Sequence, residues 1–235
     1  MISFQDVSLE VKNPSNKIPS IRDLVTLKTK CIDSFFVLKN VSFKVQSGEK
    51  LGIIGTNGSG KTSLLRLIAG TYTATHGFTS VTGSVQPLIS LGLGLNGDDT
   101  LIDNIVTMLV IDGMEIGTAR LLAPELLEEV GLSEFANFQY KNLSSGMQMR
   151  ANFSVILSSN PEILLIDEFF GAGDKNFIDH ARAKMVSFIE NSGIFIFSSH
   201  SRELIEKFCR RVIILERGEI TFDGEVKDGC ERYWG

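Results

Sequence analysis

The segment that most restricts the fold of this chain is the glycine-rich run Gly55-Thr56-Asn57-Gly58-Ser59-Gly60-Lys61-Thr62. Residues 51–54 before it are an apolar, strand-like stretch, and residues 63–68 after it have the apolar spacing of a helix. Glycines in such a run let successive backbone N–H groups point inward without an obstructing side chain. The start of the helix adds partial positive charge, and Lys61 adds a mobile cation. The order strand, loop and helix therefore predicts a cradle for phosphate groups within an α/β fold.

The residue types in this run fit a bound nucleoside triphosphate. Lys61 is expected to reach the β- and γ-phosphates, and the hydroxyl of Thr62 is a suitable ligand for Mg²⁺. The nucleotide-binding residues that the motif predicts are Gly55, Thr56, Asn57, Gly58, Ser59, Gly60, Lys61, Thr62 and Ser63. The chain is therefore predicted to bind a nucleoside triphosphate together with Mg²⁺.

Two carboxylates follow a later apolar run and suggest the other half of the site. Residues 163–166 read as a buried strand, and Asp167 and Glu168 come directly after it. An acid at the end of a strand beside the phosphate loop can hold Mg²⁺, which fits Asp167. A second acid next to it can accept a proton from the attacking water, which fits Glu168 as the general base. The alternative is an ordinary strand end with two solvated acids.

Composition excludes several other classes of protein. The 28 acidic and 23 basic residues among 235 give a formal net charge of −5, which argues against a broad nucleic-acid-binding surface. The apolar runs are strand-sized, so no membrane span is expected, and the N-terminus lacks the pattern of a secretory signal. Cys31, Cys209 and Cys230 show no CxxC spacing, so we expect buried or half-buried thiols in a reducing compartment, with neither disulfides nor a zinc site.

Short apolar runs alternate with helical stretches, which predicts a mostly parallel sheet covered by helices. The predicted strands are residues 2–11, 37–45, 50–54, 162–166, 194–198, 212–215 and 219–222. The predicted helices are residues 61–69, 101–111, 124–130, 145–157, 177–191 and 202–208. The beginning and the end of the chain are expected to be meander strands joined by turns, such as 46–49 and 216–218. The basic segment 12–31 is expected to contain a short amphipathic helix, either as a surface excursion or as a docking element.

The run Asn142-Leu143-Ser144-Ser145-Gly146-Met147 resembles the signature loop of the ATP-binding cassette (ABC) superfamily, which usually reads Leu-Ser-Gly-Gly-Gln. Leu143, Ser144 and Gly146 match its leucine, serine and second glycine, whereas Ser145 and Met147 differ. This resemblance implies that the nucleotide is ATP. It also implies a dimer in which Ser144 and Gly146 of one copy contact the nucleotide held by the other. Taken alone, a serine before a helix is also typical of a simple helix cap.

Two further positions match the superfamily. Asp174, in the segment 171–174 after the two carboxylates, falls where the D-loop of the family lies. His200 ends the run 195–200, which reads as a buried strand, and it matches the switch histidine of the family, whose imidazole can donate a hydrogen bond to the γ-phosphate. The resemblance implies a catalytic role for His200 beside Glu168. The other histidines, His76 and His180, have no such context and are expected to be surface residues.

Two positions of the family pattern are harder to place in this chain. The aromatic residue that stacks on adenine corresponds best to Phe36, with Phe35 as the neighbouring candidate, although either could equally belong to the core. The Q-loop glutamine has no counterpart, because residues 87–92 contain no Gln and Gln86 comes a few residues early. We therefore assign the Q-loop role to no residue.

The departures from the common pattern are themselves informative. They are the altered signature, the run Gly-Ala-Gly-Asp at 171–174, the run Leu-Gly-Leu-Gly at 91–94 and the basic insertion 12–31. Together they resemble the ATP-binding subunits of bacterial exporters of cell-surface polysaccharide, and O-antigen exporters of lipopolysaccharide above all. The implied fold is a P-loop NTPase of ABC type, with an antiparallel β subdomain and a helical signature subdomain at about 95–160. Residues 1–235 are expected to form one ATP-binding domain, without a C-terminal carbohydrate-binding domain.

The resemblance also implies partners and a location. They are a second copy of the chain, an integral membrane permease, and through it a lipid-linked polysaccharide, but no nucleic acid. The chain is expected at the cytoplasmic face of the inner membrane, with residues 101–111 and 20–30 as surfaces that couple it to the permease. The alternatives are the ATPase of a lipid or drug exporter, and an ABC ATPase without a transport role.

Overall fold

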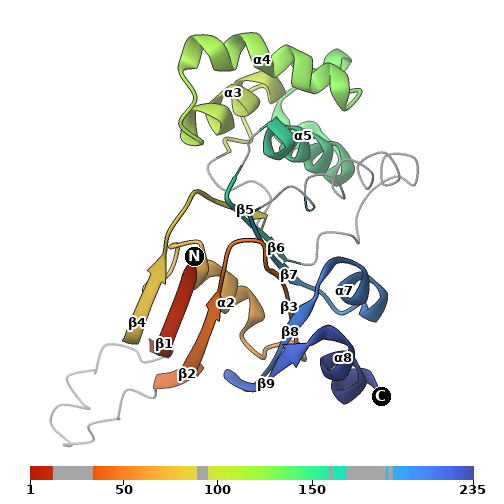
Figure 1. The fold of residues 1–235 in the computed structure, drawn as a ribbon. Helices are drawn as coiled ribbons and strands as arrows, with labels where there is room; N and C mark the ends of the chain where they lie inside the picture. Colours follow the sequence, from red (N-terminus) through yellow and green to blue (C-terminus); the bar gives the residue numbers. More distant parts are fainter. Residues whose placement is uncertain (13–33, 89–94, 159–160, 168–188, 190–192) are drawn as a thin grey trace, which may run out of the picture. The chain divides into compact units, whose positions relative to one another are not determined.

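The computed structural model describes residues 1–12, 34–88, 95–158, 161–167, 189 and 193–235 (Figure 1). These residues form two compact units, which we describe separately: Met1–Thr82 with Ser198–Gly235, and Gly83–Phe197. Several predictions concern residues that the structure does not describe. The single residues are Glu168, Asp174, Cys31 and His180. The segments are 91–94 and 20–30, with nearly all of the insertion 12–31 and of the predicted helix 177–191.

The first unit begins with an antiparallel sheet of three strands in the order β2-β1-β4. The strands are β1 (Ile2–Lys12), β2 (Ser34–Val45) and β4 (His76–Val81), and they lie side by side in Figure 1. Side chains alternate across β2, so that Val41, Phe43 and Val45 are buried and their neighbours are exposed. Phe43 stacks on Phe4 of β1, with ring centroids 4.9 Å apart. This alternation determines which face of β2 packs in the core and which face is exposed to solvent.

The same unit contains β3 (Lys50–Ile54), β8 (Arg211–Glu216) and β9 (Glu219–Glu225). Strand β8 pairs with β3 in parallel and with β9 in antiparallel fashion. Both β3 and β8 are continuous apolar runs because both of their faces are buried. Helix α2 (Lys61–Ile68) follows β3, whereas α7 (Arg202–Phe208) and α8 (Val226–Trp234) lie side by side near the C-terminus (Figure 1).

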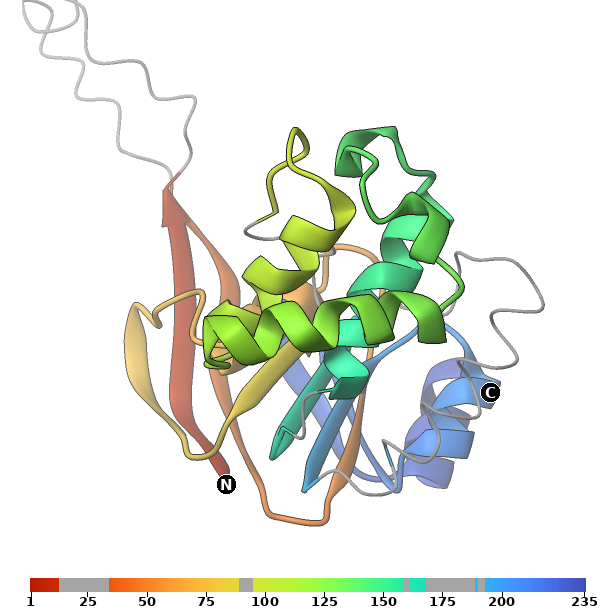
Figure 2. The same ribbon diagram turned by 90° about the horizontal axis from the view of Figure 1, so that it is seen from above.

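The second unit contains β5 (Val85–Leu88), β6 (Ile163–Asp167) and β7 (Ile194–Ser198), in that order. Strands β5 and β6 are parallel. Its helices are α3 (Leu101–Ile111), α4 (Ile116–Glu129) and α5 (Ser145–Ser158), with the short 3₁₀ helices η1 (Ser133–Phe135) and η2 (Tyr140–Asn142). The three α-helices share an apolar core that includes Leu101, Ala119, Leu127, Ala151 and Val155. Figure 2 shows α4 lying across α3 and α5. No helix in the described part of the chain is long and apolar enough to span a membrane.

The α/β class and most of the predicted elements are confirmed, and several expectations need correction. The chain end, expected to be meander strands throughout, forms α8 after β9. Helix α4 begins at Ile116 rather than at residue 124, because the Glu115 carboxylate caps it by accepting from Thr118 N–H, and Pro124 lies inside the helix. Strands β4 and β5 were not predicted.

Candidate functional site

The glycine-rich loop leads from β3 into α2, and its backbone packs closely against two neighbouring elements. A Cβ atom on Gly55 would lie 2.2 Å from the carbonyl oxygen of Leu215 at the end of β8. A Cβ atom on Gly60, whose φ is +107°, would lie 2.9 Å from the carbonyl oxygen of Val37 in β2. Gly58 differs, because nothing lies within 4 Å of the place where its Cβ would be. Gly55 and Gly60 thus allow the loop to pack against β8 and β2, whereas Gly58 lies on the side of the loop that no described neighbouring element covers.

Lys61 is the first residue of α2 and is only 8% exposed. Its Nζ donates to the carbonyl oxygens of Gly55 (2.8 Å) and Thr56 (3.2 Å) and lies 3.3 Å from Nε2 of His200. The ammonium group is therefore held within the loop, where the sequence predicted that phosphate oxygens bind.

His200 follows β7 and joins the loop from a distant part of the sequence. Ser199 and Ser201 fix the turn around it: Ser199 Oγ accepts from Ser201 N–H, and Ser201 Oγ caps α7 by accepting from Leu204 N–H. Because an ammonium group can only donate, Nε2 of His200 takes the place of the acceptor in this contact. His200 therefore lies beside the phosphate loop, and its predicted contact with a γ-phosphate stays a prediction.

Ser59 provides a test of whether the loop fits a phosphate ligand. The residue is 2% exposed, and its buried hydroxyl has no hydrogen-bond partner among the described residues. Buried polar groups are almost always paired, so an unpaired one requires an explanation. A phosphate oxygen in the loop would accept from this hydroxyl. With the buried ammonium of Lys61 and the open side at Gly58, the loop therefore fits a triphosphate.

The turn between β8 and β9 is hydrogen-bonded to the phosphate loop, a role that the sequence analysis did not predict. Gly218 N–H donates to the carbonyl oxygen of Ser59 (3.0 Å), and Lys39 N–H donates to the carbonyl oxygen of Gly218 (2.8 Å). Glu219, the first residue of β9 after this turn, pairs with Lys39 Nζ at 2.6 Å. A single glycine thus connects the phosphate loop to β2. The sequence signal was the Arg-Gly turn at 217–218, but nothing local shows what that turn contacts.

Phe36 lies on β2, and the structure decides one of the alternatives left open for it. The side chain is 45% exposed, and that of Phe35 is also exposed, so neither phenylalanine belongs to the core. The ring of Phe36 lies 6.3 Å from that of His76, which is a surface residue as predicted. An exposed aromatic ring is available for stacking on a base, and the assignment of Phe36 to adenine stays a prediction.

The predicted metal ligands belong to different units. Thr62 lies in the first turn of α2, and Asp167 is the last residue of β6, where it is half-buried. Among the residues that the structure describes, no group of three or more His, Cys, Asp or Glu side chains is placed to hold a metal ion. Mg²⁺ on a nucleotide needs only one or two carboxylates beside water and phosphate oxygens, so a hydroxyl and a carboxylate are suitable ligand types, and the assignment of Thr62 and Asp167 stays a prediction.

The signature-like run lies at the N-terminus of α5 in the second unit. Ser144 Oγ accepts from Met147 N–H at 3.3 Å, which is the geometry of a helix cap. Ser144 itself is exposed, and the nearest atom to a Cβ on Gly146 would be Ser144 Oγ at 4.0 Å. Ser144 therefore lies exposed at a helix N-terminus with the half-buried Gly146 beside it, a place that favours anions.

Gln86, which comes too early for the Q-loop, lies within β5. It lines a cavity of about 490 Å³ in the second unit, together with Leu109, Asp112 and Met114. Burial raises the pKa of the Asp112 carboxyl, the one acid among the described residues that line this cavity. The structure gives no reason to assign the Q-loop role to Gln86.

Comparisons with known protein sequences show the family and two kinds of relative. Residues 38–171 match the sequence pattern of the family described as ABC transporter. The O-antigen export system ATP-binding protein RfbE of Yersinia enterocolitica is 43% identical over 183 residues, which are 78% of this chain and 77% of that protein. The teichoic acids export ATP-binding protein TagH of Listeria innocua is 34% identical over 232 residues, which are 99% of this chain and 69% of that protein.

Solved structures show the same fold. A dimeric, post-hydrolysis structure of the ATP-binding cassette MJ0796 bound to ADP and Pi matches with a TM-score of 0.75 at 21% identity, covering 96% of this chain and 99% of that one. A second dimeric structure of MJ0796, described as a bacterial ABC transporter cassette, has a TM-score of 0.72 at 22% identity and the same coverage. At these identities the likeness concerns the fold alone, and it confirms the predicted fold class.

Proposed function

The chain belongs to the ABC transporter family, and from that premise we propose that it is the ATP-hydrolysing subunit of an exporter of lipid-linked cell-surface polysaccharide. The polysaccharide we propose is the O-antigen of lipopolysaccharide. The observation that carries this proposal is the 43% identity to an O-antigen export protein over 78% of the chain. The similarity to teichoic acid export proteins along 99% of the chain supports the broader class, polymers of the cell surface.

The residues of the phosphate loop would bind the triphosphate. In the proposed site, Lys61 supplies a positive charge to the β- and γ-phosphates, and the buried Ser59 hydroxyl donates to a phosphate oxygen. Thr62 and Asp167 would hold Mg²⁺, which neutralises phosphate charge when it is bound. Phe36 would stack on the adenine, while Glu168 would accept a proton from the attacking water. His200, beside Lys61, would sense the γ-phosphate.

The proposed working form contains two copies of the chain. Ser144 and Gly146 at the start of α5 would contact the nucleotide held by the other copy, and Asp174 would lie close to it. The dimeric structures of related cassettes support this arrangement. Binding of ATP would close the two copies and hydrolysis would reopen them, which would move a membrane permease at the cytoplasmic face of the inner membrane. We treat residues 1–235 as one ATP-binding domain, with a helical subdomain at about 95–160.

The test is the variant Glu168→Gln. The amide keeps the shape of the carboxylate but cannot accept a proton from water, so the variant should bind Mg-ATP normally and lose steady-state hydrolysis. Glu162→Gln is the matched control, because Glu162 is an exposed acid next to the other end of β6. Calorimetry measures binding, and phosphate release measures turnover. Normal hydrolysis by Glu168→Gln would refute the assigned role.

The export function needs a test in cells. In the source bacterium, deletion of the gene should leave the lipid-linked polysaccharide on the cytoplasmic side of the inner membrane. The Glu168→Gln chain should fail to restore export. The Glu162→Gln chain should restore it. Normal surface polysaccharide in the deletion strain would overturn the proposal, even if the ATPase activity is as expected.

A further inference from the structure

Asn104, in the first turn of α3, is a buried polar residue to which the proposed function assigns no role. It is 2% exposed. Its Nδ2 donates to the carbonyl oxygens of Asn96 (2.9 Å), Thr100 (3.0 Å) and, at 3.5 Å, Asp99. Its Oδ1 accepts from Asn96 N–H at 3.0 Å. One amide thus uses both its donor and its acceptor groups to hold the loop 96–100 on α3.

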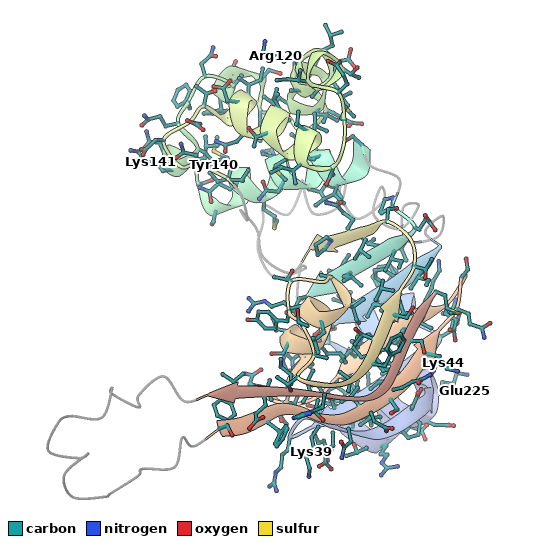
Figure 3. The ribbon with its side chains drawn as sticks, turned by 90° about the vertical axis from the view of Figure 1, so that its left-hand side faces the viewer. Lys39, Lys44, Arg120, Tyr140, Lys141 and Glu225 are labelled. Carbon is teal, nitrogen blue, oxygen red and sulfur yellow. The ribbon has the colours of Figure 1, made fainter. Side chains whose placement is uncertain are left out.

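The other side of this loop is bound to the segment 136–141. Backbone N–H groups and carbonyl oxygens join the two segments at 2.8–3.0 Å, in the pairs Leu101 to Phe138, Ile102 to Ala136, Tyr140 to Asp99 and Lys141 to Gly97. Lys141 Nζ also lies 2.5 Å from Asp98 Oδ1 and, by this hydrogen bond and its charge, lowers the pKa of that carboxyl. A Cβ on Gly97 would lie 3.3 Å from that of Lys141, so the contact is close. Figure 3 shows Tyr140 and Lys141 next to each other beside the helices of this unit.

The segment 136–141 leads directly into the signature-like run. Tyr140 begins η2, Leu143 after it is buried, and Ser144 caps α5. Helix α5 also holds the segment from its own side, because Gln148 Nε2 donates to the Tyr140 carbonyl oxygen at 2.9 Å and Asn152 Nδ2 donates to the Tyr140 hydroxyl at 3.1 Å. Ser144 is therefore placed by two supports, α5 and the loop 96–100.

We propose that Asn104 is a positioning residue for Ser144: by fixing the loop 96–100, it sets where the signature-like run lies when two copies close on nucleotide. This inference rests on the proposed function, because it takes Ser144 to contact the nucleotide of the second copy. The phosphate loop belongs to the other compact unit and makes its own contacts. Loss of the Asn104 amide therefore weakens closure of the dimer while one copy still binds ATP.

The experiment compares variants in the Glu168→Gln background, in which ATP is not consumed. Asn104→Leu removes all the amide hydrogen bonds at similar volume, and Asn104→Ser is a milder change that keeps a hydroxyl donor. We expect the affinity of the dilute monomer for Mg-ATP to stay within about twofold of the parent value. We expect the dissociation constant of the ATP-bound dimer, measured by sedimentation, to rise at least about tenfold for Asn104→Leu and less for Asn104→Ser.

Glu115→Ala is the matched control. Glu115 caps α4 in the same helical core, where its carboxylate accepts from Thr118 N–H at 3.0 Å, and it takes no part in the contacts between loop 96–100 and segment 136–141. It should lower the melting temperature without weakening the dimer. Equal weakening by Glu115→Ala would reduce the effect to general stability and overturn the inference, as would normal dimerisation of both Asn104 variants. A parent protein that neither binds ATP nor dimerises would instead contradict the proposed function.

Discussion

Replacing Gly218 by alanine tests how the phosphate loop is held. Gly218 has a φ of +83°, and its Cβ would lie 2.5 Å from the carbonyl oxygen of Val37 and 3.2 Å from Cα of Leu38. Both contacts are with backbone atoms of β2, which cannot rotate away as a side chain can. The added methyl group must therefore push the turn away from β2. The N–H that donates to Ser59 in the phosphate loop moves with it.

The size of the effect follows from two contributions. An alanine held at positive φ costs about 1–2 kcal/mol relative to glycine. Loss of the hydrogen bond to the Ser59 carbonyl oxygen costs about 1 kcal/mol more. We expect the free energy of unfolding to fall by about 2–4 kcal/mol, with the steric overlap accounting for the upper end. Only the displacement of the loop acts on the ligand, so the affinity for ATP should fall on the order of tenfold, or about 1.4 kcal/mol.

Gly48→Ala separates the two contributions. Gly48 lies in the turn between β2 and β3 with a φ of +87°, and nothing lies within 4 Å of its Cβ position. The control should therefore lose about 1–2 kcal/mol of stability and bind ATP as the wild type does. Urea unfolding and calorimetry with Mg-ATP measure the two quantities on both variants. The reasoning fails if Gly218→Ala keeps wild-type affinity, or if Gly48→Ala loses as much affinity.

Two further changes have defined outcomes. Lys61→Ala removes a charged donor from the phosphate loop, so the affinity for ATP in calorimetry should fall on the order of a hundredfold or more; wild-type affinity would contradict the geometry. Burial raises the pKa of the Cys209 thiol above its unfolded value of about 8.5, so the native thiol stays neutral while the unfolded one ionises at higher pH. The contribution of this thiol to stability is therefore fully present below about pH 8.5, and above that pH the free energy of unfolding should fall by about 1.4 kcal/mol per pH unit. Urea unfolding at several pH values should find a smaller slope for Cys209→Ala than for the wild type, and equal slopes would refute the assignment.

Elements with local end signals could be predicted from the sequence. Helices α3 and α7 have the predicted bounds because Thr100 and Ser201 cap them with side-chain oxygens, and both caps follow from residue type. Strand β3 has its predicted bounds because its apolar run ends at the first glycine of the phosphate loop. The burial of Cys209 and Cys230 was also foreseen and is confirmed.

Elements that depend on distant partners could not be predicted. Helix α8 contains Gly229, which weakens a helix signal, yet a Cβ there would lie 2.1 Å from Val212 Cγ1 of β8. The glycine is present because the helix packs on the sheet, and no local pattern reveals that contact. No residue of strand β4 is buried, and among the described strands it pairs with β1 alone, so its sequence lacks the buried alternation that indicates a strand. In both cases tertiary contact decides the structure.

Gly218 and Asn104 each hold a loop in place, at two different parts of the proposed nucleotide site. Each fixes a loop through contacts with backbone groups, Gly218 at the phosphate loop and Asn104 at the loop 96–100. In the proposed dimer each nucleotide is held by residues from two copies, and closing two copies already costs translational and rotational freedom. Any loop that remained to be ordered would add its own conformational entropy to that cost. Preformed loops reduce it, so Gly218→Ala should weaken the first binding step and Asn104→Leu the closure that follows.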